Sequence, residues 1–225
     1  MSIFTPACDW KAAEFSPSLG AMLTDLPNLL TLSRIVAIPV LVVLCVLHSP
    51  AGDLAACALF AAAGITDYFD GRLARGRMQL SELGRMLDPI ADKLLVGATL
   101  MLLVGLDRMP DSGLYPAIII MLREILVSGL REYLAGLRVG LPVTKLAKWK
   151  TGFQMAALGT LLGGDTAAPL LGLGFVPVTL IGEIMLWAAA VLTLVTGWDY
   201  LTAGLRHIAP SPGGKPAVGS PAPNP

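Results

Sequence analysis

Four aspartates lie close together in the segment DYFDGRLARGRMQLSELGRMLDPIADK, residues 67–93. They form two pairs, Asp67 with Asp70 and Asp88 with Asp92. A helix turns about 100° per residue, so residues three or four apart share one face. Each helix would therefore present two carboxylates on one side, and a short loop would make the two helices antiparallel neighbours on which all four carboxylates converge.

Facing carboxylates repel one another unless a positive charge lies between them. Oxygen ligands without His or Cys favour a hard cation, Mg²⁺ or Mn²⁺, and two such cations can clamp a phosphoryl group. Gly71 and Ala74 continue the face of the first pair, and Gly84 lies one turn before the second. These small residues would let a ligand approach the backbone, although tight helix packing is an alternative reason for them. Solvated surface charges are the alternative to a metal site.

The elements that carry these residues are strongly apolar. The chain has 225 residues, of which 55% are hydrophobic and 14% charged, against about 25% charged in a soluble domain. A membrane helix needs about 20 apolar residues. The sequence predicts six such helices, at about 29–47, 54–70 with a continuation past Arg75, 84–106, 114–135, 150–162 and 175–200. The expected fold is an all-α integral membrane protein.

Three regions are expected along the chain. Residues 1–23 form an N-terminal segment with a short interfacial helix that Pro27 stops, residues 24–206 form the membrane domain, and residues 207–225 form a disordered tail rich in Pro and Gly. The three cysteines show no disulfide or metal-ligand spacing. The net charge of zero gives no attraction to nucleic acid, and the N-terminus lacks a signal-peptide pattern.

Basic residues predict the orientation of the chain in the membrane. The loops on the side of the termini and of the aspartates hold Arg72, Arg75, Arg77, Arg85, Arg138, Lys145 and Lys148. The opposite loops hold only Arg108. By the positive-inside rule, the termini and the aspartates face the cytoplasm.

The aspartate segment follows the pattern D-x2-D-G-x2-A-R-x8-G-x3-D-x3-D, with Asp67, Asp70, Gly71, Ala74, Arg75, Gly84, Asp88 and Asp92 at its fixed positions. It resembles the signature of the CDP-alcohol phosphotransferases, in which an alcohol displaces CMP from a CDP-linked donor. The resemblance implies a six-helix membrane fold, a homodimer and two divalent cations, Mg²⁺ or Mn²⁺, held by the four aspartates. It also implies donor contacts at Asp67, Gly71, Ala74, Arg75 and Gly84.

Residues 26–40, 121–136 and 145–155 resemble segments of bacterial phosphatidylglycerophosphate synthases. This resemblance implies a protein of the bacterial inner membrane that uses CDP-diacylglycerol and sn-glycerol 3-phosphate. Other members of the same family, of cardiolipin, phosphatidylserine or inositol-phosphate type, are the nearest alternatives. A divalent-cation transporter that uses the same carboxylates is an alternative of another class.

Basic residues near the aspartates suit a phosphorylated acceptor. Arg123 and Arg131 are eight positions apart on one predicted helix face, and an arginine inside a membrane indicates function. Pairing with a neighbouring glutamate is the alternative, although Glu124 is expected to point elsewhere. Lys145, Lys148 and Lys150 cluster at the cytoplasmic mouth, where an ordinary basic loop or contact with anionic lipid would also explain them. The candidates for the acceptor's phosphate are Arg34, Arg123, Arg131, Lys145 and Lys148.

The start of the first helix carries further polar residues. Asn28, Thr31 and Arg34 can hydrogen-bond the donor's diphosphate, and Asn28 can equally cap the helix after Pro27. Asp92 is the expected general base that takes the proton from the acceptor hydroxyl. Glu183, inside the last helix, is left without an assigned role.

Overall fold

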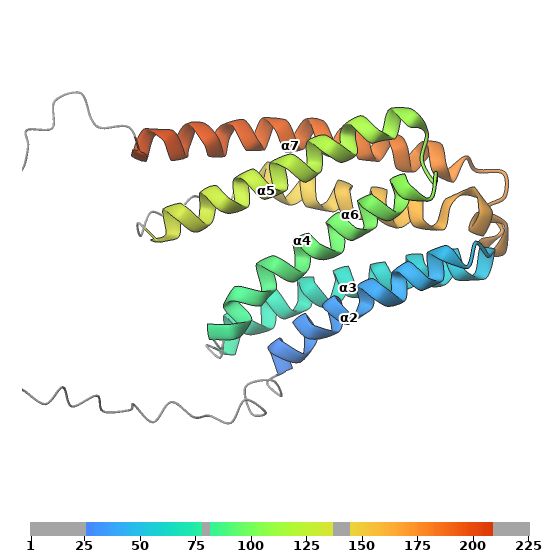
Figure 1. The fold of residues 1–225 in the computed structure, drawn as a ribbon, viewed down its shortest axis with the longest axis horizontal. Helices are drawn as coiled ribbons and strands as arrows, with labels where there is room; N and C mark the ends of the chain where they lie inside the picture. The colour runs from blue at the N-terminus through green and yellow to red at the C-terminus, as the bar shows by residue number, and fades with distance from the viewer. Residues whose placement is uncertain (1–25, 78–81, 137–144, 209–225) are drawn as a thin grey trace, which may run out of the picture.

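The computed structural model describes residues 26–77, 82–136 and 145–208 (Figure 1). The described chain is helical and contains α2 (Leu26–Val46), α3 (Pro50–Arg77), α4 (Glu82–Gly105), α5 (Leu114–Gly136), α6 (Lys145–Ala167) and α7 (Val178–Ile208). Two short 3-10 helices, η1 (Asp111–Gly113) and η2 (Ala168–Leu171), lie in the connections. The prediction of an all-α fold is confirmed, and each predicted segment coincides with one of the six α-helices.

Predicted boundaries differ from the structure at three helices. α6 runs Lys145–Ala167, beyond both ends of the predicted 150–162, so Lys145 and Lys148 belong to this helix and not to the loop before it. α2 begins at Leu26, so Pro27 lies in its first turn, where the missing backbone N–H is not needed for helix hydrogen bonds. α7 continues to Ile208, two residues into the predicted tail. The predicted interfacial helix in residues 1–23 lies outside the described residues, as does the tail beyond residue 208.

The helices lie side by side and alternate in direction (Figure 1). α2 packs against α3 and α4, α6 packs against α3 and α7, and α5 packs against α7. Over the described residues, α3 and α4 make little contact with one another. The two aspartate-bearing helices run antiparallel, as expected (Figure 1), and α2 packs against both of them.

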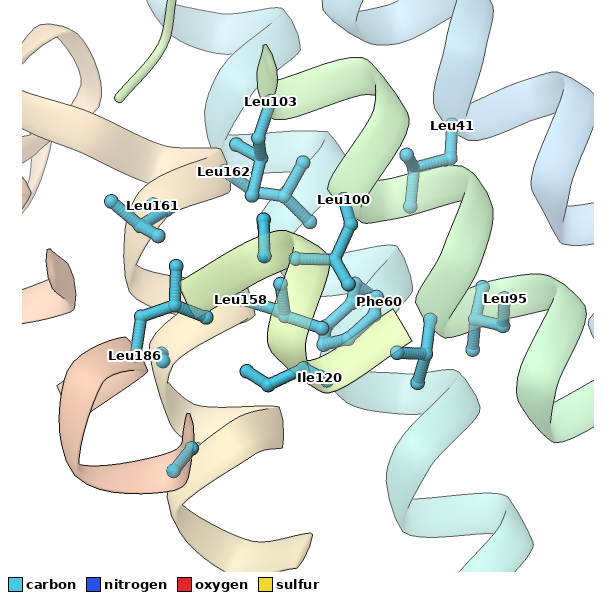
Figure 2. Close-up of a cluster of buried hydrophobic side chains, with 14 of the residues drawn as sticks. Leu41, Phe60, Leu95, Leu100, Leu103, Ile120, Leu158, Leu161, Leu162 and Leu186 are labelled. Carbon is cyan, nitrogen blue, oxygen red and sulfur yellow. The ribbon is translucent and has the colours of Figure 1, made fainter. Parts of the chain in front are cut away.

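Leucine-rich packing joins the six α-helices at the centre of the bundle (Figure 2). Phe60 of α3 is 1% exposed and packs among leucines of α4 and α6. Leu41, Ile120 and Leu186 bring α2, α5 and α7 into the same cluster. Apolar packing of this kind holds the helix ends that carry the polar residues at fixed distances from one another.

The outside of the bundle is apolar as well. Among the described residues, three spans are long and apolar enough to cross a membrane, Asn28–Val46, Asp111–Gly136 and Val178–Leu205. Large apolar side chains on these spans are exposed, among them Val43, Leu122 and Val191. So much exposed apolar surface suits a bilayer and not water. α3, α4 and α6 are not among these spans, and each carries several charged residues.

A buried ion pair ties the bundle together at the end opposite to the aspartate motif. Arg108, after α4, lies 2.5 Å from Asp53 in the first turn of α3. The guanidinium also donates to the backbone carbonyls of Cys45 at 2.8 Å and Leu162 at 3.3 Å. The Thr166 hydroxyl donates to Asp53 at 2.7 Å. These bonds connect α2, α3, α6 and the segment after α4, so Arg108 is a structural residue.

Candidate active site

One face of α2 carries three polar residues that are almost wholly buried. Asn28, Thr31 and Arg34 are 3%, 0% and 2% exposed, and their spacing of three places them on one side of the helix. All three are held by polar contacts. The Arg34 guanidinium forms an ion pair with the carboxylate of Asp67 on α3. This face of α2 therefore fixes the first aspartate of the motif.

Asp67 remains open on its other side. Its side chain is 45% exposed, whereas that of Arg34 is 2% exposed. Asp92 on α4 is partly buried and lies within electrostatic range of Asp67, Arg34 and Glu124. The first and last aspartates of the motif, on two helices, thus lie within electrostatic range of one another and of the buried guanidinium.

The remaining motif side chains lie outside the described part of the structure. They are Asp70, Gly71, Ala74, Arg75, Gly84 and Asp88, whose backbone belongs to α3 and α4. Among the described residues no group of three or more His, Cys, Asp or Glu side chains could hold a metal ion. The predictions of donor contacts and of a four-aspartate metal site stay predictions.

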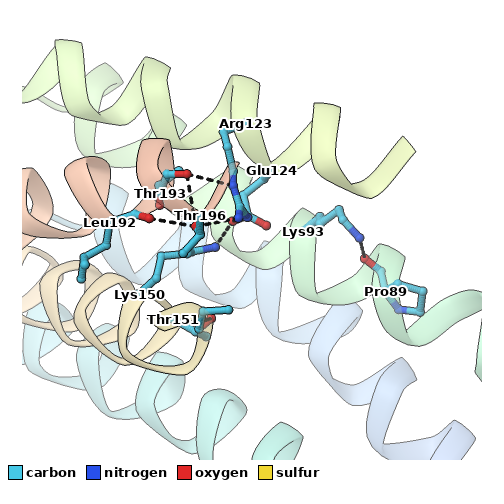
Figure 3. A network of polar contacts seen from close by, with 10 residues as sticks. Pro89, Lys93, Arg123, Glu124, Lys150, Thr151, Leu192, Thr193 and Thr196 are labelled. Carbon is cyan, nitrogen blue, oxygen red and sulfur yellow. Dashed lines mark hydrogen bonds and ion pairs between the residues drawn. The ribbon is translucent and has the colours of Figure 1, made fainter. Parts of the chain in front are cut away.

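A second polar cluster links α5, α6 and α7 (Figure 3). Arg123 on α5 donates through Nε to the carbonyl of Thr193 at 3.1 Å and through Nη2 to the Thr196 hydroxyl at 2.8 Å. Its Nη1 lies 3.5 Å from Oε1 of Glu124. The ammonium of Lys150 on α6 forms an ion pair with the same Glu124 oxygen. The expectation that Glu124 points away from Arg123 was wrong, because both long side chains bend toward α6 and α7.

The predicted acceptor residues occupy different surroundings. The guanidinium groups of Arg123 and Arg131 lie 5.7 and 5.3 Å from the ring centroid of Tyr200, as two arginines on one face of α5 should. Arg131 itself is exposed, and so is Lys148. The side chain of Lys145 lies outside the described residues. Arg123 and Arg131 are thus brought together, and Lys148 lies at the surface.

Three residues near this cluster were not among the predicted site residues. Lys150 is only 5% exposed, and Glu124 holds it. Gln154, one turn further along α6, is 3% exposed, and its carboxamide oxygen has no hydrogen-bond partner among the described residues. The spacing of four between Lys150 and Gln154 was a usable signal, because it places two polar side chains on one face of an apolar helix.

Glu183, left unassigned from the sequence, accepts a hydrogen bond from the hydroxyl of Ser112 in η1. This contact connects α7 to the turn before α5. It lies at the end of the bundle where Arg108 is found, away from the aspartate motif (Figure 1).

Comparison with known proteins decides the family. The model of the CDP-alcohol phosphatidyltransferase family matches residues 24–195. The chain belongs to this family. The description is that of an enzyme, so the alternative of a divalent-cation transporter is dropped, and the all-helical apolar structure agrees with a membrane protein.

Three relatives show how far the similarity extends. The CDP-diacylglycerol–glycerol-3-phosphate 3-phosphatidyltransferase of Rickettsia bellii is 45% identical, with 81% of this chain and 97% of that protein covered. The protein of the same name from Bacillus subtilis is 35% identical, with 79% and 94% covered. A probable phosphatidylglycerophosphate synthase of Mycobacterium tuberculosis is 38% identical, with 84% and 85% covered.

Proposed function

We propose that this protein transfers the phosphatidyl group of CDP-diacylglycerol to sn-glycerol 3-phosphate, giving phosphatidylglycerophosphate and CMP. The names of the similar bacterial enzymes support this choice of donor and acceptor. The observation that carries it is the buried Lys150 beside Arg123, within electrostatic range of Asp92. A buried ammonium near the reacting carboxylates suits an acceptor that carries its own phosphate, which serine and plain glycerol lack.

Two divalent cations, Mg²⁺ or Mn²⁺, would be held by Asp67, Asp70, Asp88 and Asp92. The donor set fits hard cations because it consists of carboxylates, and the partly exposed Asp67 can reach a ligand from the open side. When bound, the cations would supply positive charge that compensates the diphosphate and the departing CMP. Asn28, Thr31 and Arg34 line the same end of the bundle and would hold the donor's diphosphate in place.

The chain's own residues then carry the transfer. The acceptor hydroxyl attacks the phosphorus that bears diacylglycerol, a new P–O bond forms, and the P–O bond to CMP breaks. Asp92 accepts the hydroxyl proton as the new bond forms, because a free hydroxyl has a pKa far above that of a carboxylate. Lys150 and Arg131 orient the acceptor through its phosphate, while Arg123 is held in place by α7.

In this proposal all six α-helices cross the inner membrane of a bacterium, and the site faces the cytoplasm, in line with the basic residues on that side. The protein acts as a homodimer, as the resemblance to the family implies. The donor's acyl chains stay in the bilayer while the head groups react at the helix ends.

The direct test is release of CMP from CDP-diacylglycerol by the purified protein with a panel of acceptors. We expect sn-glycerol 3-phosphate to exceed glycerol, serine and phosphatidylglycerol by at least about 100-fold in kcat/KM. Chelation should abolish turnover, and Mg²⁺ or Mn²⁺ should restore it. Efficient use of serine or phosphatidylglycerol would overturn the acceptor assignment, and full activity in chelator would overturn the metal pair.

A further inference from the structure

We propose that Glu124 is a positioning residue, which holds the ammonium of Lys150 in the orientation that receives the acceptor's phosphate. The assignment rests on the proposed function and adds to it a residue that does not itself touch the substrate. A carboxylate at an anion site would otherwise oppose binding, so its presence beside Lys150 needs a physical reason.

The first step is the burial of Lys150. An ammonium out of water is strongly destabilised unless a partner compensates its charge. Glu124 is its only hydrogen-bond partner among the described residues, and an ammonium has three protons. One proton therefore fixes the group to α5, and two stay available for an anion.

The second step is the rigidity of Glu124 itself. Arg123 is fastened to α7 through the Thr193 carbonyl and the Thr196 hydroxyl, and its Nη1 lies beside Glu124 (Figure 3). Glu124 therefore lies between a guanidinium that α7 immobilises and the ammonium that it orients. Arg123 and Glu124 therefore connect α7 to Lys150 on α6, and this connection fixes where the ammonium lies.

The third step is the charge of the cluster. Two cations share one carboxylate, so Arg123, Glu124 and Lys150 together carry a net charge of +1. Lys150 lies within electrostatic range of Asp92, which places this charge toward the reacting end. Glu124 thus fixes one cation without cancelling the attraction for a phosphate.

An independent observation points to a ligand on the same face of α6. Gln154 follows Lys150 by one turn, and its buried carboxamide oxygen accepts no hydrogen bond from the described residues. An unpaired buried acceptor costs about 1–3 kcal/mol. An acceptor molecule whose phosphate is bound by Lys150 would bring hydroxyl groups that can donate to this oxygen.

The test uses Glu124→Gln in the full-length protein, with Glu132→Gln as the matched control on the exposed side of α5. We expect Glu124→Gln to raise the KM for sn-glycerol 3-phosphate at least about tenfold while the KM for CDP-diacylglycerol changes less than about twofold. Binding of sn-glycerol 3-phosphate to the donor-free protein, measured by calorimetry, should weaken in parallel. Glu132→Gln should change neither constant.

Glu124→Asp keeps the charge but shortens the reach, so we expect an intermediate KM, and this variant carries the test if Glu124→Gln does not fold. In a Lys150→Met background, Glu124→Gln should add little to the KM, because the group that it positions is gone. An unchanged or lower KM for sn-glycerol 3-phosphate in folded Glu124 variants would overturn the assignment. Absence of turnover of this acceptor by the wild type would instead overturn the proposed function, and this assignment with it.

Discussion

Two buried ion pairs lie toward opposite ends of the bundle, and they differ in how many protein groups bind the cation. Arg108 uses its guanidinium on Asp53 and two backbone carbonyls, and Asp53 also accepts from Thr166. At the other end, the Lys150 ammonium has Glu124 as its only partner among the described residues, and nearby Gln154 has a buried oxygen without one. A cation held by several helices stabilises the bundle, whereas a cation with a single protein partner can also bind a ligand.

The largest effect should come from Asp92→Asn, near the end of the bundle that holds Lys150. Without a carboxylate to accept the hydroxyl proton, kcat should fall by about 10³-fold or more. The apolar core carries the fold, so thermal unfolding in detergent should stay near that of the wild type. The assay is CMP release with both substrates saturating. Activity above about a tenth of the wild-type value would remove Asp92 from the reaction.

The end of the bundle that holds Arg108 should respond in stability instead. Arg108→Met leaves Asp53 buried without its partner, which costs about 3–5 kcal/mol for a buried pair. Thermal unfolding should show this loss, while the KM values of the remaining folded enzyme stay unchanged. Adding Asp53→Leu should recover most of the stability, because the unpaired charge is gone. A raised KM with normal stability would contradict the structural role.

Lys150→Met should separate acceptor from donor. Loss of a charged hydrogen bond to phosphate in a partly dry site costs about 2–3 kcal/mol, so kcat/KM for sn-glycerol 3-phosphate should fall roughly 30- to 160-fold. The KM for CDP-diacylglycerol should stay near the wild-type value. Arg131→Ala should cost less, about tenfold, because this side chain is exposed and water can replace part of its contact. A larger loss of kcat/KM in Arg131→Ala than in Lys150→Met would make Arg131 the main phosphate ligand.

The smallest effect expected is that of Gly197→Ala on α7. An added Cβ would lie 3.1 Å from Cγ and 3.3 Å from Nε of Arg123, whose guanidinium is already fixed by α7. A displacement of a few tenths of an ångström should raise the KM for sn-glycerol 3-phosphate about threefold. Gly105→Ala, with nothing within 4 Å of the added atom, is the control. Equal increases in this KM in Gly197→Ala and Gly105→Ala would contradict the proposal that α7 acts on Lys150 through Arg123.

The sequence was most informative where function depends on spacing within one helix. The shared face of Arg123 and Arg131 and the presence of the six helices follow from local periodicity. The pairing of Arg34 with Asp67 could not be predicted in this way, because the two residues belong to different helices and lie 33 positions apart.

The side of α6 that is buried also depends on tertiary packing. Lys148 and Lys150 are two positions apart and point to different sides of the helix, and only the packing of α6 against α3 and α7 decides which of them is buried. From the sequence alone both lysines fit a basic cytoplasmic mouth equally well. The predicted site therefore included Lys148 and left out Lys150, the lysine that the fold buries. Glu124 was misjudged for a related reason. Neighbouring residues on a helix point in different directions at their Cβ atoms, but the ends of long side chains can still bend toward one another.

The contacts of Arg108 can form only in a certain order while the chain is synthesised. Its acceptors belong to residues 45, 53 and 162, and the chain is synthesised from its N-terminus. The guanidinium can therefore meet Cys45 and Asp53 as soon as α4 is made, but it stays short of one acceptor until α6 has emerged. Thr166 reaches Asp53 at the same stage. The ion pair gains its last contacts only after a late helix has joined the early ones, so an incomplete chain lacks two hydrogen bonds that the finished protein has.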